Sequence, residues 1–525
     1  MEGNICPTTL PASEVNRVSE RRILSRGLYL SYVALFLNLA TSFVLTPLIL
    51  GYLGQSLYGV WAILSSIITY IQLFDFGMNT AVAKFAAEFQ ATNQKEKLNK
   101  FISSAFAVLL GVGCLAILIN VGLLPLIPRL IDIPEESVFP VQVALLAMGV
   151  NVLFAFLGGV FENIIYGFQR VDIWKIFSVT RLLSYALFTV LFLKLGMGIV
   201  GVAIASASST LVLFPLYLLV FKGGNYGIAI RPSLVDVKIL RETAPYSIRS
   251  FALGITSRML YQTDSIVIGI ILGAAQVTPY AIAYRLCFMA TYLFSQISTV
   301  MFPVFSKLNA LGDLNALRGL YLTTTRISVG IMTPIAIYLL LFGHSFINLW
   351  VGPENWVGFN VFLLFIIMDF IHAIGTPPGL LLQGIGKNKW FTYSEMVNAG
   401  LNLLLSIILA PKLGVFGVML GTLVAHSLTS TWSVPLLACR HIELSVKQYV
   451  RAGILPPILA GIPACAATWL LVRNLSADTS YFQLGVKGVL VLAIYLPIFI
   501  AIGTTQDDRR LFLSLLPSSV RTSER

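Results

Sequence analysis

Residues 49–64 read ILGYLGQSLYGVWAIL, and residues 271–286 read ILGAAQVTPYAIAYRL. Both segments begin with Ile-Leu-Gly, and both place a tyrosine (Tyr58 and Tyr280) nine residues after the isoleucine. The shared glycine and tyrosine positions lie between apolar runs, so a duplication explains them better than chance similarity between apolar helices does. Two further pairs of similar segments follow in the same order, 167–174 with 384–390 and 198–202 with 414–418.

The composition around these segments is that of a membrane protein. Of the 525 residues, 57% are hydrophobic and only 11% are charged, whereas a soluble domain has roughly 25% charged residues. The mean hydropathy is +0.85. Because a spanning helix needs about 20 apolar residues, we expect an all-α integral membrane protein with about fourteen transmembrane helices. The apolar runs place them near 27–50, 56–76, 101–125, 139–165, 176–194, 200–221, 245–272, 279–305, 327–347, 359–385, 394–411, 414–438, 452–473 and 484–503.

The duplication predicts how these helices are organised. Each copy of the repeat holds six helices, an even number, so both copies enter the membrane from the same side and have the same orientation. Two like-oriented six-helix bundles followed by two extra C-terminal helices suit an alternating-access carrier. The expected segments are a cytoplasmic N-terminal segment (1–26), an N-terminal bundle (27–221), a cytoplasmic linker (222–244), a C-terminal bundle (245–438), two additional helices (439–503) and a cytoplasmic tail (504–525).

The basic residues predict the orientation in the membrane. Of the 35 lysines and arginines, 27 fall in segments on the side of the N-terminus, five fall on the other side, and Arg181, Arg258 and Arg285 lie within spans. Cytoplasmic loops collect Lys and Arg. We therefore expect a multi-pass protein of the cell membrane with both termini in the cytoplasm, and the net charge of +12 indicates this orientation rather than a nucleic-acid partner.

Polar residues within the C-terminal bundle indicate a hydrated lumen. Ionisable groups at membrane depth cost about 2.5–3.5 kcal/mol each and usually face a cavity. Arg258 and Asp264 lie close to the middle of the span at 245–272, whereas Arg181 and Arg285 lie nearer to span ends, where snorkelling or local pairing is the alternative. Hydrogen bonding between helices is the alternative for the polar stripes. These stripes are Ser250, Gly254, Ser257, Tyr261 and Asp264; Asp369, His372, Thr376, Gly379 and Gln383; and Glu395, Asn398 and Asn402.

Two prolines within the second stripe predict a local irregularity. Residues 375–378 read Gly-Thr-Pro-Pro, and neither proline supplies an amide hydrogen. We expect the helix to break there, because a broken helix at membrane depth is tolerated where it lines a cavity.

The chain lacks the motifs of enzymes and ATP-driven pumps. It contains no GxxxxGK[ST] phosphate loop and no HExxH sequence. The spans leave no room for a catalytic domain of about 100 residues or more. We therefore expect no enzymatic activity, no catalytic residues, no metal centre, and no cofactor apart from a coupling ion, H⁺ or Na⁺. The four histidines, His344, His372, His426 and His441, fall on separate segments.

Three motifs carry a family resemblance. The sequence YIQLFDFGMNTAVAKFAAE at 70–88 resembles the end of the second span in the polysaccharide-transporter branch of the multidrug/oligosaccharidyl-lipid/polysaccharide flippase superfamily. The sequence LGQSLYGVW at 53–61 is similar to the first loop of that family, and YQTDSIVIG at 261–269 resembles its seventh span. The span number, the duplication and the cytoplasmic termini fit the same family.

The resemblance implies a flippase that moves undecaprenyl-diphosphate-linked oligosaccharide from the cytoplasmic to the outer leaflet, for O-antigen, capsule or exopolysaccharide synthesis. It also implies a V-shaped, MATE-like pair of bundles. The partners would be this lipid-linked substrate, membrane lipid, and a polysaccharide polymerase and glycosyltransferases of the same pathway. Guanidinium groups match phosphate oxygens. The expected substrate-binding residues are Arg258, Arg181, Arg285, Tyr261 and Gln383, and the expected ion-coupling residues are Asp264, Asp369 and His372.

Two other functions fit the same residues. A cation-coupled multidrug antiporter of the same superfamily would need acidic lumen groups such as Asp264 and Asp369. A lipid II flippase of peptidoglycan synthesis would share the fold and the substrate chemistry.

Overall fold

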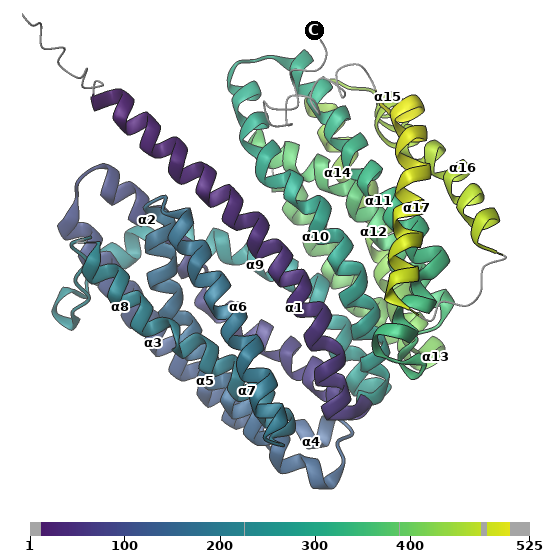
Figure 1. The fold of residues 1–525 in the computed structure, drawn as a ribbon. Coiled ribbons are helices and arrows are strands. Elements are labelled where there is room, and N and C mark those ends of the chain that lie inside the picture. The colour runs from purple at the N-terminus through teal and green to yellow at the C-terminus, as the bar shows by residue number, and fades with distance from the viewer. Residues whose placement is uncertain (1–11, 225, 388, 474–479, 505–525) are drawn as a thin grey trace, which may run out of the picture. The chain divides into compact units, whose positions relative to one another are not determined.

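The computed structural model shows a chain folded into two compact helical units, Met1–Ile255 (unit 1) and Thr256–Arg525 (unit 2) (Figure 1). It describes residues 12–504 except 225, 388 and 474–479, and the side chains of these residues except 12–29, 31, 32, 249, 252–261 and 292–300. Every regular element in this described part is a helix. Helix α9 (Val237–Ile271) belongs to both units.

Unit 1 is built around α5 (Val138–Gly167), which packs against α2, α3 and α7, and Figure 1 shows α3, α5 and α7 side by side. Small residues bring these helices close together, as is common in membrane bundles. A Cβ atom on Gly149 of α5, for example, would lie 2.9 Å from Nδ2 of Asn120 in α3. The other helices of unit 1 are α1 (Ala12–Ile71), α2 (Met78–Ala91), α3 (Lys95–Leu123), α4 (Ile127–Leu130), α6 (Val171–Lys194), α7 (Gly198–Leu211) and α8 (Leu213–Gly223).

The Asp-Phe-Gly turn before α2 fixes the first part of α9 within unit 1. The backbone N–H of Gly77 donates to Asp75 Oδ1 at 2.9 Å, and Gly77 has a φ of 72°, which favours glycine. A Cβ atom on Gly77 would overlap the carbonyl oxygen of Ser247 in α9. The rings of Phe76 and Phe251 pack with their centroids 5.1 Å apart. The turn therefore needs glycine for both its conformation and its contact with α9.

Residues 227–236, which we call the α3 strap, lie along α3. Asn99, Ser103 and Ser104 of α3 exchange hydrogen bonds of 2.8–3.4 Å with its backbone. Helix α9 begins one residue after the strap. The segment expected as a linker, 222–244, thus contains a bonded strap and the first two turns of α9. The bonded backbone groups belong to Gly227, Ala229, Arg231 and Asp236.

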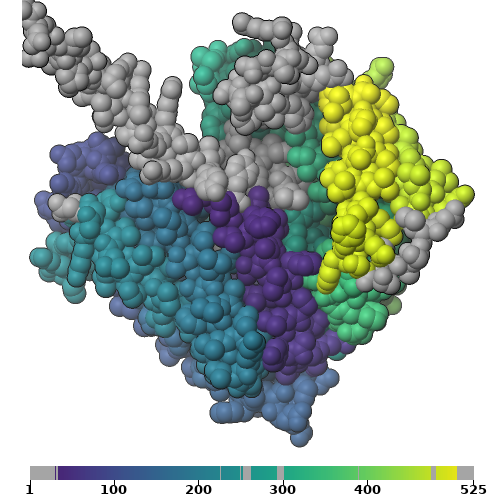
Figure 2. Space-filling model, in the orientation of Figure 1, coloured from purple at the N-terminus to yellow at the C-terminus, as the bar shows by residue number. Residues whose placement is uncertain are grey.

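Unit 2 places α10, α11 and α12 against one another, and α12 also contacts α13 and α14. Helices α16 and α17, the yellow pair in Figures 1 and 2, lie side by side and pack on α11. Ala460, Leu484 and Tyr495 belong to the buried cluster that joins them to Ile337 and Phe342. The bounds are α10 (Ala274–Ala310), α11 (Leu314–Val351), α12 (Phe359–Gly384), α13 (Lys389–Leu428), α14 (Ser430–His441), α15 (Val446–Tyr449), α16 (Leu455–Val472) and α17 (Tyr481–Ile498).

Ten segments of the described residues are long and apolar enough to cross a membrane. Their outer faces carry exposed apolar side chains, such as Leu118 (66% exposed), Leu187 (65%) and Phe482 (78%), which suit contact with lipid. The prediction of an all-α multi-pass membrane protein is therefore confirmed. The segments are Val33–Asp75, Lys95–Leu123, Glu135–Gly167, Val171–Lys194, Gly198–Gly223, Leu314–Val351, Phe359–Gly384, Lys389–His441, Val446–Val472 and Tyr481–Gly503.

The expected break at the Pro-Pro sequence is wrong, because α12 continues through Pro377 and Pro378 to Gly384. Proline at 378 leaves the carbonyl of Ile374 without its usual helical donor. The hydroxyl of Tyr449 in α15 donates to that carbonyl at 3.0 Å. A donor from another helix thus replaces one of the two missing amide hydrogens and supports α12 at this point.

Candidate functional site

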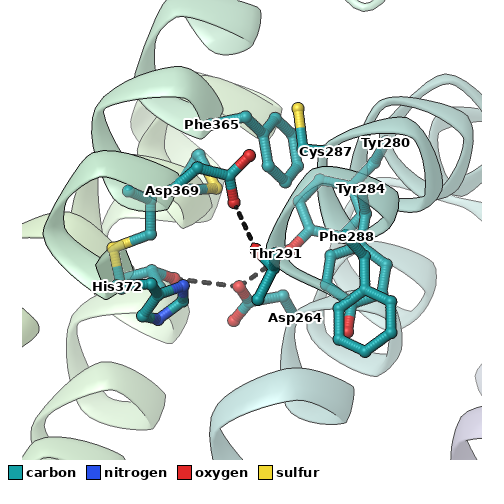
Figure 3. Close-up of a pocket in the computed structure, with 12 residues that line it drawn as sticks. Asp264, Tyr280, Tyr284, Cys287, Phe288, Thr291, Phe365, Asp369 and His372 are labelled. Carbon is teal, nitrogen blue, oxygen red and sulfur yellow. Dashed lines mark hydrogen bonds between the residues drawn. The ribbon is translucent and has the colours of Figure 1, made fainter. Parts of the chain in front are cut away.

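Two acidic residues from different helices line one cavity inside unit 2 (Figure 3). Asp264 comes from α9 and Asp369 from α12. The cavity, which we call the carboxylate cavity, has a volume of about 50 Å³, enough for a small ion or a few water molecules. Its lining residues are Asp264, Tyr280, Tyr284, Cys287, Phe288, Thr291, Phe365, Met368, Asp369, His372, Met419 and Thr422.

Asp264 is held on one side of its carboxylate only. The side chain is buried, and its Oδ2 accepts hydrogen bonds of 2.9 Å from the hydroxyls of Tyr280 and Thr422. Its Oδ1 has no donor among the described residues. This oxygen is therefore open to a water molecule, a proton or a cation that enters the cavity.

Asp369 repeats this pattern from the opposite helix. Its Oδ1 accepts from the Thr291 hydroxyl at 2.9 Å, a bond drawn in Figure 3. Its Oδ2 has no donor within the described part of the chain. The carboxylate cavity therefore presents two acidic groups that each have one open oxygen, which is the arrangement a positive charge can satisfy.

Amide groups extend this polar cluster along α13. The Ser406 hydroxyl donates to Asn402 Oδ1 at 2.9 Å, and Thr422 Oγ1 lies 3.2 Å from the same oxygen. Among the described residues, Asn402 Nδ2 and both amide atoms of Asn398 lack partners. The buried amide of Asn402, which shares Thr422 with Asp264, thus retains unused hydrogen-bonding capacity, which is uncommon in a packed interior.

A second polar cavity lies between α12, α13 and α14, and we call it the α12–α14 cavity. Its volume is about 270 Å³. His372 lines both cavities, so this side chain lies where the two cavities adjoin. The lining residues are Ile371, His372, Gly375, Thr376, Gly379, Leu380, Gln383, Phe391, Glu395, His426, Ser430 and Val434.

Two histidines that are far apart in the sequence meet at this point. The rings of His372 and His426 lie edge to face with centroids 5.5 Å apart. Thr431 Oγ1 donates to the His426 carbonyl at 2.9 Å and lies 3.0 Å from His426 Nδ1. Because that hydroxyl has one hydrogen, His426 Nδ1 is the donor of the second bond. The scattered histidines of the sequence therefore include one adjacent pair.

Arg181, an expected substrate-binding residue, lies in unit 1 and has a local partner. Its Nη1 lies 2.9 Å from Glu162 Oε1, and the Tyr217 hydroxyl donates to the same oxygen at 2.7 Å. Glu162 is buried, whereas the Arg181 side chain is 41% exposed. The local pairing that the sequence left open as an alternative is thus present.

The other expected site residues are distributed unevenly. Gln383 lines the α12–α14 cavity, whereas Arg285 is half-buried on α10 and lines neither cavity. The side chains of Arg258 and Tyr261 lie outside the described residues. Four further residues, Tyr280, Thr291, Thr422 and His426, carry no sequence motif that predicts a role at these cavities, apart from the place of Tyr280 in the repeat.

Comparison with known proteins identifies the family. Residues 52–359 match the family model described as "Polysaccharide biosynthesis protein". The chain is 21% identical to the membrane protein EpsK of Bacillus subtilis over 91% of this chain and 95% of the relative. It is also 21% identical to a Salmonella typhimurium protein named as an O-antigen transporter, over 74% of this chain and 90% of the relative.

Two solved structures share the fold. The lipid II flippase MurJ, in an inward closed conformation, matches with a TM-score of 0.68 and 15% identity over 93% of this chain and 99% of its own. An inward-facing multidrug resistance MATE family transporter matches with a TM-score of 0.64 and 17% identity over 78% of this chain and 94% of its own. The expected MATE-like fold is therefore confirmed, and the chain belongs to the polysaccharide biosynthesis protein family, a family of multi-pass transporters and flippases.

Proposed function

We propose that this chain flips an undecaprenyl-diphosphate-linked oligosaccharide from the cytoplasmic to the outer leaflet, for the synthesis of O-antigen, capsule or exopolysaccharide. The observation that carries the proposal is the pair of polar cavities inside unit 2 of a polysaccharide-family transporter. A diphosphate with attached sugars cannot cross hydrocarbon unaided, because its polar groups would lose their hydrogen bonds to water. Polar side chains that line cavities can form hydrogen bonds with the diphosphate and the sugars in place of water as the substrate crosses the membrane.

We propose that the protein has fourteen spans. Twelve of them form two like-oriented six-helix bundles, two are additional C-terminal helices, and both termini lie in the cytoplasm. Two of the ten apolar segments, Val33–Asp75 and Lys389–His441, are about twice the length that one span needs. Each contains a glycine with non-helical angles, Gly54 and Gly414. These breaks support two spans in each segment, and α9 and α10 are long enough to supply two more.

The proposal assigns coupling to the carboxylate cavity. The open oxygens of Asp264 and Asp369 can take a proton or a sodium ion, and His372 connects this site with the α12–α14 cavity. A cation that binds one conformation of the protein more tightly than another shifts the equilibrium toward the first conformation. An ion gradient can then drive the transport cycle.

Diphosphate binding is assigned to arginine on sequence grounds. Arg258 is the cation nearest to the middle of its span, with Tyr261 on the adjoining polar stripe. Arg285 and Arg181 are further candidates, and the Arg181 guanidinium also pairs with Glu162.

The test reconstitutes the purified chain in liposomes with a fluorescently labelled undecaprenyl-diphosphate sugar and a membrane-impermeant quencher. We expect the protein to speed the exchange of the labelled lipid between leaflets, compared with protein-free liposomes. Two further compounds are assayed in parallel. Lipid II tests for a lipid II flippase, and ethidium tests for a multidrug antiporter, for which the acidic residues of the carboxylate cavity would also be suitable. Transport of ethidium without movement of the sugar lipid would overturn the proposal in favour of the antiporter.

A further inference from the structure

The α12–α14 cavity has the chemistry of a sugar-binding site. Its polar lining groups include a carboxylate (Glu395), an amide (Gln383) and the hydroxyls of Thr376 and Ser430. All of these bond to sugar hydroxyls, which both donate and accept. Phe391 adds an aromatic ring, which suits the apolar face of a sugar ring.

Glycines on α12 create the space beside this ring. A Cβ atom on Gly379 would lie 3.4 Å from Cε2 and Cζ of Phe391, so the ring already lies close to the α12 backbone there. A Cβ atom on Gly375, one helical turn earlier, would meet no atom within 4 Å. The volume of about 270 Å³ therefore lies next to Gly375, and it is large enough for one sugar ring with its hydroxyls.

The charge of the lining is one-sided. Glu395 is the only acidic residue among the twelve that line the cavity, all of which the structure describes, and these include two histidines (His372 and His426) but no lysine or arginine. The nearest basic residues in sequence, Lys387 and Lys389, are exposed at the α12–α13 connection. A sugar carboxylate in this cavity would face Glu395 with no lysine or arginine among the lining residues, and two negative charges at short range repel.

We infer that the α12–α14 cavity binds one sugar ring of the lipid-linked oligosaccharide and selects against a ring that carries a negative charge. This inference rests on the proposed function and adds to it a rule of substrate selection. The hydroxyl or amino groups of glucose and aminosugar rings donate hydrogen bonds to the Glu395 carboxylate. A uronic acid ring meets it as a like charge and is excluded.

The test uses four synthetic undecaprenyl-diphosphate probes: the bare diphosphate, and the diphosphates of glucose, glucosamine and glucuronic acid. Binding to the full-length chain in nanodiscs is measured at pH 8, where unperturbed histidine is neutral. We expect the glucuronic acid probe to bind at least about tenfold more weakly than the glucose probe. The glucosamine probe should bind at least as tightly as the glucose probe.

Two variants separate the charge of the cavity from its shape. Glu395→Gln should remove most of the difference between the glucose and glucuronic acid probes, whereas Glu136→Gln, at an exposed position in a short 3-10 helix of unit 1, should leave it unchanged. Gly375→Leu fills the cavity, so it should weaken all three sugar probes and spare the bare diphosphate.

The outcomes distinguish this inference from the proposed function. Equal binding of the glucose and glucuronic acid probes to the wild-type chain would overturn the inference alone. The same holds if the difference survives in Glu395→Gln. If no diphosphate probe binds at all, the proposed function fails, and the inference fails with it.

Discussion

The hydroxyl of Tyr449 donates a hydrogen bond to the carbonyl of Ile374 across 3.0 Å, in place of the amide hydrogen that Pro378 lacks. Tyr449→Phe removes this donor and leaves a partly buried carbonyl unpaired, at a cost of about 1 kcal/mol. We expect the thermal unfolding temperature of the purified chain to fall by about 2 °C or more. Tyr393→Phe, at an exposed position on α13, is the control and should have no such effect. Equal unfolding temperatures for both variants would mean that the bond does not support α12.

Neutralising either acid of the carboxylate cavity should uncouple transport from the ion gradient. Asp264→Asn and Asp369→Asn keep the size of each side chain but remove the charge that an ion would balance. The stimulation of flipping by an imposed proton or sodium gradient should fall about fivefold or more in each variant. Asp132→Asn, on an exposed loop of unit 1, should retain full stimulation. Unchanged stimulation in both cavity variants would remove the carboxylate cavity from the coupling mechanism.

Replacing Arg258 should weaken transport of the diphosphate. A charge-assisted contact contributes about 1.5–3 kcal/mol, so Arg258→Ala should lower transport by roughly one to two orders of magnitude at limiting substrate. Arg258→Lys should recover only part of this loss, since lysine lacks the planar fork of donors. Restored transport in the charge-swapped variant Arg258→Asp/Asp369→Arg would instead identify a structural ion pair.

Arg181 should matter for stability more than for substrate. Arg181→Leu leaves the buried carboxylate of Glu162 without its basic partner, which is destabilising. We therefore expect a lower unfolding temperature for the single variant and recovery in Arg181→Leu/Glu162→Gln. If transport stays low in a double variant whose unfolding temperature has recovered, Arg181 contacts the substrate as well.

The topology of unit 2 can be read with fusion reporters. A reporter after Asp313 or Lys387 should be cytoplasmic, and one placed within 352–358 should lie outside, because α11 and α12 each cross once between these points. Reporters on the same side at all three positions would contradict the span count in this part of the chain.

Much of the carboxylate cavity is predictable from the sequence, because its acidic residues lie on regular helix stripes. Asp264 lies on a polar stripe of one segment, and Asp369 and His372 lie on a stripe of another. Each stripe has the period of a helix face, so it can be recognised from its own segment alone. Tyr280, Thr291 and Thr422 complete the site from other helices, and the packing of helices cannot be read from the period of one. The same limit explains the error at Pro377 and Pro378. The donor that supports α12 at this point, Tyr449, lies on a separate helix far along the chain.

The α3 strap leaves no flexible linker in the chain between the two units. Its backbone is bonded to α3 from Gly227 to Asp236, α9 starts at Val237, and this helix then runs without interruption into unit 2. A loose tether would let the units reorient by swinging a loop. Among the described residues, the covalent connection is a helix that is anchored at its start, so a reorientation between the units has to bend or twist the backbone of α9 beyond Phe251.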